Sequence, residues 1–357
     1  GEAIIRIVDF HGAAVLCIDR KKMVDYNDCK LLLALQGKYR LPYRKEPSPM
    51  KKTIACPRTF SSGALNVLLK LTSKRSPKTE KTEAHCREYI QSLAAKNAQP
   101  VPTPQKTVGQ PVEDRTVDGM QTFVWGGSSD PDQPAILYLH GGAYMNQPVS
   151  FHYKMVAHFA AALGARVYFP VYPKIPEHNY KEAYAKLNTL YGQILEAHKP
   201  ENVIFMGDSS GAGLALGLAC WLRDNAKPLP RELMLLSPWL DVHTAPAELD
   251  AYLKNDPTLS PWRLRIMGEM WAGSKEDMSS PYVSPMFCDP AGLPPITMLT
   301  GTHDVLCPDV LKFSEKLDSL GVRHKLYVFE GMVHDFIAFP IAQAKPAQEL
   351  VIRLLKH

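Results

Sequence analysis

The pentapeptide Gly-Asp-Ser-Ser-Gly at residues 207–211 constrains the fold of this chain more than any other stretch. The apolar run over residues 202–206 predicts a buried strand before it, and the run over residues 212–220 suits a helix after it. A strand, a sharp turn and a helix around Gly-x-Ser-x-Gly are typical of a nucleophile elbow. Because the turn is tight, only small residues fit beside the serine. The pattern therefore predicts that the Ser209 hydroxyl stands at the end of a strand, beside a helix N-terminus that favours negative charge.

The length and composition fit one large α/β domain with additional helices. Of the 357 residues, 45% are hydrophobic and 22% are charged. These fractions are near the globular average and predict a full core. The 41 basic and 36 acidic residues leave a net charge of +5. The basic clusters lack the aromatic interleaving of a nucleic-acid-binding surface, so we expect no nucleic-acid partner.

The cysteine pattern and the apolar runs bear on location. The 7 cysteines are scattered and form no Cys-x-x-Cys pair. This spacing predicts neither a disulfide framework nor a zinc site, and it favours a reducing compartment. No apolar run approaches the length of a membrane-spanning helix, and the first residues lack the layout of a signal peptide. We therefore expect a cytoplasmic protein without a membrane span.

The chain divides into three parts. Residues 1–49 mix short apolar runs with charges, and Met50 begins a stretch that resembles a natural start. We interpret residues 1–49 as an N-terminal extension of unclear role outside the catalytic unit. Residues 50–114 carry two amphipathic patterns and then a Pro-rich polar stretch, so we interpret them as cap helices and a linker. Residues 115–357 alternate strands with helices and form the predicted catalytic domain.

The catalytic domain is expected to hold a mostly parallel sheet covered by helices on both faces, because its apolar strands are continuous rather than alternating. A segment with weaker periodicity and many prolines, residues 241–290, is interpreted as an insertion. The strands are expected at residues 119–126, 135–140, 166–172, 202–207, 232–237, 295–301 and 324–330. The helices are expected at residues 150–163, 178–197, 210–224, 261–272, 308–320 and 343–356.

A serine hydroxyl is a weak nucleophile at neutral pH, so it needs a base, and the base needs an orienting acid. Asp304 and His334 each follow a predicted strand late in the chain. Functional groups gather at the carboxyl ends of parallel strands, and the chain order Ser, Asp, His is that of α/β-hydrolases. We predict Ser209 as nucleophile, His334 as base and Asp304 as its orienting acid. The rival acid, Asp309, is interpreted as the beginning of the next helix.

The stretch His-Gly-Gly-Ala at residues 140–143 follows an apolar strand well before the serine. Glycine lets the backbone approach a substrate closely and point N–H groups at it. We assign the oxyanion-hole donors to the N–H groups of Gly141, Gly142 and Ser210. The loss of one such donor costs about 2.7–4 kcal/mol of barrier stabilisation. His140 is interpreted as a brace for the loop rather than as an acid or base.

Together these motifs resemble the hormone-sensitive-lipase-like family of α/β-hydrolase esterases, as in a bacterial carboxylesterase. The resemblance covers residues 115–357 and, loosely, residues 61–114. It implies an α/β-hydrolase fold with a mostly parallel eight-stranded sheet, helices on both faces and a helical N-terminal cap. The chain departs from the family pattern at Ala143, where many relatives have a third glycine, and at Ser210, where alanine is usual. Further matching stretches are residues 172–178, 236–241 and 280–285.

The predicted reaction is hydrolysis of a small, short-chain acyl ester through an acyl-enzyme, with no metal or organic cofactor. Activity is expected to rise through a histidine ionisation at about pH 6–7. Three alternatives stay open: an amidase or deacetylase of small N-acyl compounds, an acyltransferase, and a non-catalytic ligand-binding protein on the same fold. Retention of Ser209, Asp304 and His334 argues against the binding protein. The resemblance also allows a homodimer, since relatives often pair near the sheet edge formed by strand 324–330.

Overall fold

The computed structural model describes residues 5–10, 13–18, 50–56, 82–127, 130, 132–245 and 249–356. It separates into two units, Gly1–Pro47 and Ser48–His357. In the first unit, β1 (Ile5–Phe10) and β2 (Ala13–Ile18) pair in antiparallel fashion. The amphipathic pattern over residues 64–69 lies outside the described residues.

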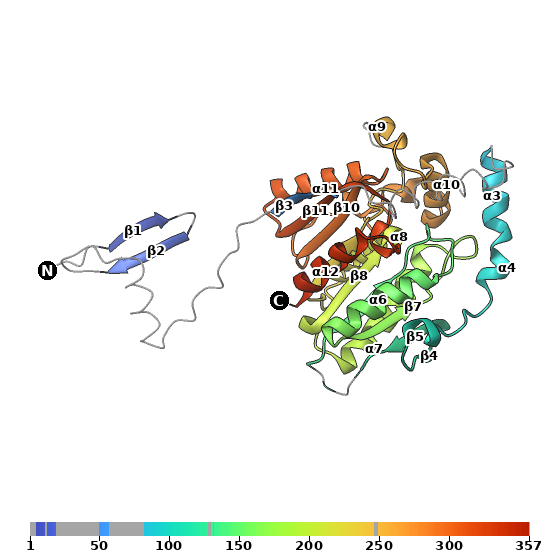
Figure 1. Ribbon diagram of the computed structural model, residues 1–357, viewed down its shortest axis with the longest axis horizontal. Helices are drawn as coiled ribbons and strands as arrows, with labels where there is room; N and C mark the ends of the chain where they lie inside the picture. The colour runs from blue at the N-terminus through green and yellow to red at the C-terminus, as the bar shows by residue number, and fades with distance from the viewer. Residues whose placement is uncertain are drawn as a thin grey trace. The chain divides into compact units, whose positions relative to one another are not determined.

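The second unit is built on one sheet, with nine strands among the described residues in the order β3-β11-β10-β9-β8-β6-β7-β5-β4 (Figure 1). The strands from β3 to β7 along this order are parallel, and β5 and β4 continue the sheet in antiparallel pairing. The expected mostly parallel α/β architecture is confirmed. The strands are β3 (Met50–Ile54), β4 (Glu113–Val117), β5 (Met120–Trp125), β6 (Ala135–Leu139), β7 (Arg166–Pro170), β8 (Val203–Asp208), β9 (Glu232–Leu236), β10 (Ile296–His303) and β11 (His324–Val333).

The seven expected strands are all present, and the structure adds β3 and β4, so the sheet exceeds the eight strands that the resemblance implied. β3 pairs with β11 and forms one edge of the sheet, with Lys51, Lys52 and Thr53 exposed. Charged side chains on an edge strand oppose pairing with another chain. Those same charges explain why hydrophobic periodicity did not predict this strand.

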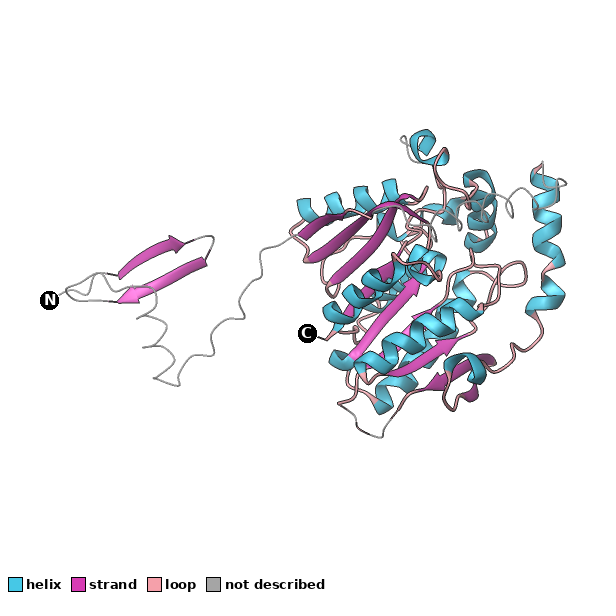
Figure 2. Cartoon of the chain, viewed as in Figure 1, coloured by secondary structure: helices cyan, strands magenta, loops and turns pink. Residues whose placement is uncertain are grey.

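Helices cover both faces of the sheet (Figure 2), and each of the six expected helices is present with its ends within two residues of the prediction. Four short 3-10 turns, η1 (Pro200–Asn202), η2 (Glu276–Ser279), η3 (Pro285–Phe287) and η4 (Phe336–Ala338), are also described. The α-helices that the structure describes are α3 (Glu83–Ser92), α4 (Ala94–Asn97), α5 (Gln105–Val108), α6 (Ser150–Leu163), α7 (Tyr180–Ala197), α8 (Ser209–Asp224), α9 (Leu249–Leu253), α10 (Pro261–Ala272), α11 (Cys307–Ser319) and α12 (Ala344–Leu355).

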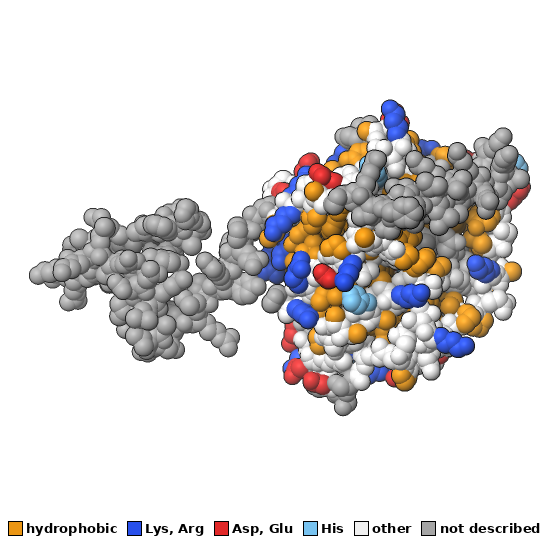
Figure 3. Space-filling model, in the orientation of Figure 1, with side chains coloured by type: hydrophobic (Ala, Val, Ile, Leu, Met, Phe, Trp, Pro, Cys, Tyr) orange, Lys and Arg blue, Asp and Glu red, His pale blue; other side chains and the backbone are white. Residues whose placement is uncertain are grey.

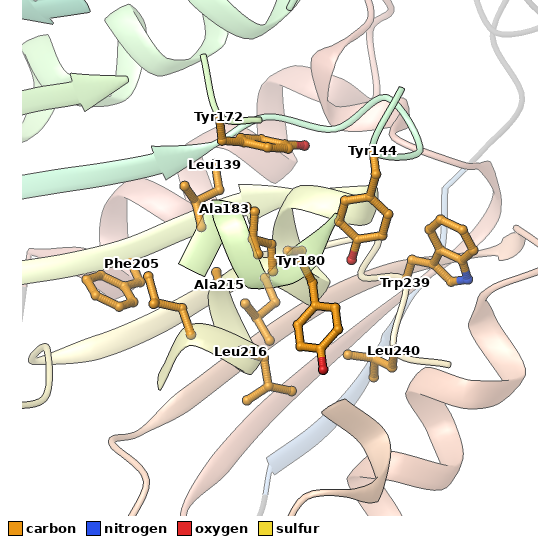
Figure 4. Packing of buried hydrophobic residues seen from close by; sticks show 14 of the residues in the cluster. Leu139, Tyr144, Tyr172, Tyr180, Ala183, Phe205, Ala215, Leu216, Trp239 and Leu240 are labelled. Carbon is orange, nitrogen blue, oxygen red and sulfur yellow. The ribbon is translucent and has the colours of Figure 1, made fainter. Parts of the chain in front are cut away.

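Two hydrophobic cores lie on opposite faces of the sheet. The first contains buried side chains of α7, α8 and α11, and Figure 4 shows part of it. The second contains those of α6 and α12. Strand β8 serves both, because Val203 and Phe205 join the first core while Ile204 and Met206 join the second. Successive side chains of a strand point to opposite faces, so a continuous apolar run is what a strand between two helical layers requires.

The region between residues 241 and 290 carries α9, α10 and two short 3-10 turns. Helix α10 packs beside α3, and Arg87 of α3 forms an ion pair with Glu269 of α10 at 3.0 Å. On the face shown in Figure 3, the Lys and Arg side chains are scattered among apolar and uncharged ones. Among the described helices, none combines the length and the apolar character needed to cross a membrane.

Candidate active site

The turn between β8 and α8 has the geometry that the pentapeptide predicted. Asp208 ends β8, and Ser209 begins α8 with a φ of 52°. A non-glycine residue rarely adopts this left-handed conformation, and it persists where the surrounding structure enforces it. A Cβ atom at Gly207 would lie 2.6 Å from the backbone of Gly211, and one at Gly211 would lie 2.0 Å from the Leu139 carbonyl oxygen. Only glycine fits at either place.

The structure brings Ser209, His334 and Asp304 together. Ser209 Oγ lies 2.9 Å from His334 Nε2, and His334 Nδ1 lies 2.8 Å from Asp304 Oδ2. All three residues are buried, Asp304 completely. The second oxygen of Asp304 accepts the N–H of Leu306 at 2.9 Å, which fixes the carboxylate on its loop. Asp309 lies in the first turn of α11, where the sequence placed it.

The electrostatics of His334 differ from those of a free histidine. Burial by itself would lower the pKa of His334, but the charges of Asp304 and Asp335 raise it well above the ordinary value of 6.5. The imidazolium form is therefore stabilised by two carboxylates. We therefore expect the ionisation of His334 above the pH range of about 6–7 that sequence reasoning, which assumed an unperturbed histidine, predicted.

Asp208 is a buried hub beside the nucleophile. Its Oδ1 accepts the Tyr138 hydroxyl at 2.5 Å and the backbone N–H of Gly141 at 2.9 Å. Its Oδ2 lies 3.1 Å from His152 Nε2. Because His152 Nδ1 accepts the N–H of Val149, Nε2 carries the proton that it donates to Asp208. Burial would raise the pKa of Asp208, but His152 and the hydrogen bonds lower it to about 2.

The N–H of Gly141 thus has a partner inside the protein, which differs from its predicted place in the oxyanion hole. The glycine is needed for another reason: a Cβ atom there would lie 2.2 Å from Asp208 Oδ2. The next residues turn sharply, with φ of 122° at Gly142 and 53° at Ala143. Neither of their N–H groups is donated to an acceptor among the residues that the structure describes. Sequence reasoning assigned no donor to Ala143, which stands where many relatives have a third glycine.

Hydrogen bonds and aromatic stacking hold the loop that carries Gly142 in place. Tyr172 donates its hydroxyl to the His140 carbonyl at 2.6 Å, and its ring stacks on His140 at 4.5 Å. Tyr144 stacks on Trp271 of α10 at 4.1 Å, and its N–H reaches Ser210 Oγ at 3.4 Å. Burial holds the pKa of His140 well below 6.5, so this ring is neutral and braces the loop as predicted.

Asp335 is a residue that sequence reasoning missed. Its Oδ2 lies 3.2 Å from His334 Nε2, and only 17% of its side chain is exposed. Its backbone is left-handed, with a φ of 51°. Burial raises the pKa of Asp335 to about 6, although the neighbouring His334 acts in the opposite direction. The one signal in the sequence was its position directly after His334.

The sheet order and the elbow define the class of protein as an α/β-hydrolase, and the comparisons with known proteins agree. A family model described as the alpha/beta hydrolase fold matches residues 136–338. An esterase of Acinetobacter venetianus is 32% identical over 205 residues, which cover 57% of this chain and 68% of that protein. An acetyl-hydrolase of Streptomyces hygroscopicus is 32% identical over 203 residues, with the same two shares.

Solved structures show the same likeness. The crystal structure of EstE5 soaked with p-nitrophenyl butyrate superposes with a TM-score of 0.68 at 26% identity, over 82% of this chain and 97% of that one. The chain belongs to the hormone-sensitive-lipase-like family of α/β-hydrolase esterases. It is a carboxylesterase.

Proposed function

We propose that this chain hydrolyses small, short-chain acyl esters through an acyl-enzyme, with Ser209 as nucleophile, His334 as general base and Asp304 as the acid that orients it. The observation that carries the proposal is the continuous hydrogen-bonded path from Ser209 Oγ through both ring nitrogens of His334 to Asp304, at 2.9 and 2.8 Å. A nucleophile bonded to a base that is itself oriented by a third group is the signature of nucleophilic catalysis.

The reaction runs in two halves. His334 Nε2 takes the proton from Ser209 as Oγ bonds to the ester carbonyl carbon. The bond to the leaving alcohol then breaks, and Nε2–H supplies the proton to the departing oxygen. A water molecule then attacks the acyl-enzyme in the same way, with His334 again as base, and frees the acid and Ser209. Asp304 stays ionised throughout, keeps the proton on Nδ1 and stabilises the imidazolium.

In this proposal, the N–H groups of Gly142, Ala143 and Ser210 donate hydrogen bonds to the carbonyl oxygen and stabilise the negative charge that develops on it. Gly142 and Ala143 support it because their N–H groups have no acceptor among the described residues. Ser210 supports it because it lies in the first turn of α8, where N–H groups have no partner within the helix and the helix dipole is positive. Gly141, whose N–H is bonded to Asp208, is left out.

The short-chain preference is supported by two of the similar proteins. The Streptomyces hygroscopicus relative is an acetyl-hydrolase, and EstE5 was soaked with a butyrate ester.

The test is the kcat/KM for p-nitrophenyl esters from acetate to decanoate, measured for the wild type, Ser209→Ala and Ser319→Ala. Ser319 is an exposed serine at the end of α11 and serves as the matched control. We expect the highest kcat/KM for acetate or butyrate, a loss of about 10⁴-fold or more in Ser209→Ala, and no change in Ser319→Ala.

Two results would contradict the proposal. Turnover that survives in Ser209→Ala would mean that another group is the nucleophile. A kcat/KM that rises toward decanoate would contradict the short-chain preference. Running p-nitroanilides of the same acyl groups in parallel separates an esterase from an amidase, because an amidase would favour the anilide series.

A further inference from the structure

His334 Nε2 faces two oxygen atoms rather than one. Ser209 Oγ lies 2.9 Å from it, and Asp335 Oδ2 lies 3.2 Å from it. Because Nδ1 is bonded to Asp304, Nε2 of the neutral ring presents only a lone pair. A lone pair can accept the Ser209 hydroxyl proton, but it gains nothing from an ionised carboxylate. The Asp335 contact becomes an ion pair only once the ring carries a second proton.

We propose that Asp335 is a further catalytic residue of ester hydrolysis, whose carboxylate stabilises the positive charge of the His334 imidazolium between the removal of the proton from Ser209 and its delivery to the leaving alcohol. The inference rests on the proposed triad. The proton balance is closed: the proton moves from Ser209 Oγ to Nε2 as the Oγ–carbon bond forms. It stays on Nε2 while the ring charge is paired with Asp335, and it moves to the alcohol oxygen as the ester C–O bond breaks.

The backbone at Asp335 is held in a defined conformation. Its φ of 51° is left-handed, and its N–H donates to Ser237 Oγ at 3.2 Å. Its Oδ1 is buried and has no hydrogen-bond partner in the part of the chain that the structure describes. Among the described residues, the carboxylate of Asp335 therefore contacts the imidazole of His334 and no competing hydrogen-bond donor.

The charged surroundings explain why this carboxylate responds to the proton on His334. The charges that act on the pKa of Asp335 are those of His334, Asp208 and Asp304. The charge of Asp335 in turn acts to raise the pKa values of His152 and Tyr138. The two other carboxylates and burial disfavour its ionised form, while a positive ring beside it favours that form. The imidazolium–Asp335 pair is thus the arrangement that this cluster stabilises.

The pair has a second consequence at equilibrium. The same contact stabilises the protonated ring in the resting enzyme, where the ring must be neutral to act as a base. Asp335 therefore accelerates the reaction once the proton has moved, and it shifts the acid side of the pH profile toward higher pH. When the charge of Asp335 is removed, the maximal rate should fall while the acid side of the pH profile moves to lower pH. A residue with a purely structural role would not produce that combination.

The experiment compares Asp335→Asn with Asp118→Asn in kcat and kcat/KM across pH, using p-nitrophenyl acetate. Asn keeps the size of the side chain and adopts the left-handed conformation readily. Asp118 is the matched control, because it has a φ of 48° on the exposed turn between β4 and β5. We expect Asp335→Asn to move the acid limb down by about one pH unit or more and to lower the plateau kcat about tenfold. Asp118→Asn should match the wild type.

An unchanged acid limb overturns the proposal, whether or not the plateau rate falls, because a lower rate alone would reflect a structural role. If Asp335→Asn does not fold, ¹⁵N resonances of His334 in the wild type decide. The proposal expects both ring nitrogens to stay protonated well above pH 6.5 and a second inflection as Asp335 titrates. A single transition at the ordinary histidine value overturns it. Failure of the triad itself is recognised separately, by turnover that survives in Ser209→Ala.

Discussion

The carboxylate of Asp208 accepts a hydrogen bond from the backbone N–H of Gly141 at 2.9 Å. Asp208 directly precedes the nucleophile, and Gly141 begins the loop of the proposed oxyanion hole. The bond therefore links the position of Ser209 to that of the loop that must hold the developing charge. The glycine makes the approach possible, since a Cβ atom would lie 2.2 Å from the carboxylate.

Asp208→Asn is expected to weaken both stability and catalysis. An amide has a single acceptor oxygen, so it cannot serve Tyr138 and Gly141 on one side and the Nε2–H of His152 on the other. One buried donor loses its partner. A loss of about 1.5–3 kcal/mol in the free energy of unfolding follows, together with a lower kcat.

Urea denaturation and steady-state kinetics measure both effects of Asp208→Asn. The exposed Asp118→Asn is the control for the same chemical change. A variant with wild-type unfolding free energy and wild-type kcat would show that the Asp208 hub does not position the loop.

The pH dependence of kcat/KM should fall off on the acid side at a pH above the ordinary histidine value. His334 must be neutral to accept the Ser209 proton. Burial opposes its protonation, but Asp304 and Asp335 raise its pKa well above 6.5, so the inactive imidazolium persists to higher pH. The half-maximal rate is therefore expected above pH 6.5. A profile that stays flat down to about pH 5 would exclude His334 as the base.

Gly211→Ala is expected to disrupt the elbow. The added Cβ atom would lie 2.0 Å from the Leu139 carbonyl oxygen, so β6 and α8 would have to separate. Overpacking of this kind costs about 3 kcal/mol or more in the free energy of unfolding. Gly192→Ala in α7 is the matched control, since nothing lies within 4 Å of its added methyl group.

Thermal and urea unfolding compare the two glycine variants. Gly192→Ala should be more stable than the wild type by about 0.5–1 kcal/mol, because alanine favours a helix interior. Equal effects of the two substitutions would contradict the close packing at the elbow.

Truncations test the part played by β3. A chain that starts at Met50 retains the strand and should keep both fold and esterase activity, in line with the interpretation of residues 1–49. A chain that starts at Pro57 loses the strand and exposes the edge of β11 over residues 325–329. Exposed strand edges pair with other chains, so size-exclusion chromatography should show larger species for the shorter chain only. Loss of activity in the chain from Met50 would contradict the interpretation.

The elbow and the triad could be predicted from sequence because their signals are local. Gly207 and Gly211 bracket the serine within one pentapeptide, and Asp304 and His334 each follow a strongly apolar strand. Such strands place functional groups at one edge of a parallel sheet whatever the details of packing.

What could not be predicted depends on how side chains meet across the fold. The N–H of Gly141 is engaged by Asp208, and no periodicity reports the direction of a single amide. Asp335 contacts His334 Nε2 at 3.2 Å in the folded chain, and its left-handed φ cannot be recognised from the sequence. Lys51 and Lys52 interrupt the apolar pattern of the edge strand β3, and its partner β11 lies far away in the sequence. Each of these features is set by tertiary contacts rather than by local pattern.

The central claim is that Ser209 is the nucleophile, and covalent labelling tests it most directly. The wild type is treated with a fluorophosphonate, digested and analysed by mass spectrometry, alongside Ser209→Ala and the Ser319→Ala control. We predict one phosphonylated site, Ser209, that forms in step with the loss of esterase activity and is absent from Ser209→Ala. Label on another residue, or equal labelling of Ser209→Ala, would show that Ser209 is not the nucleophile.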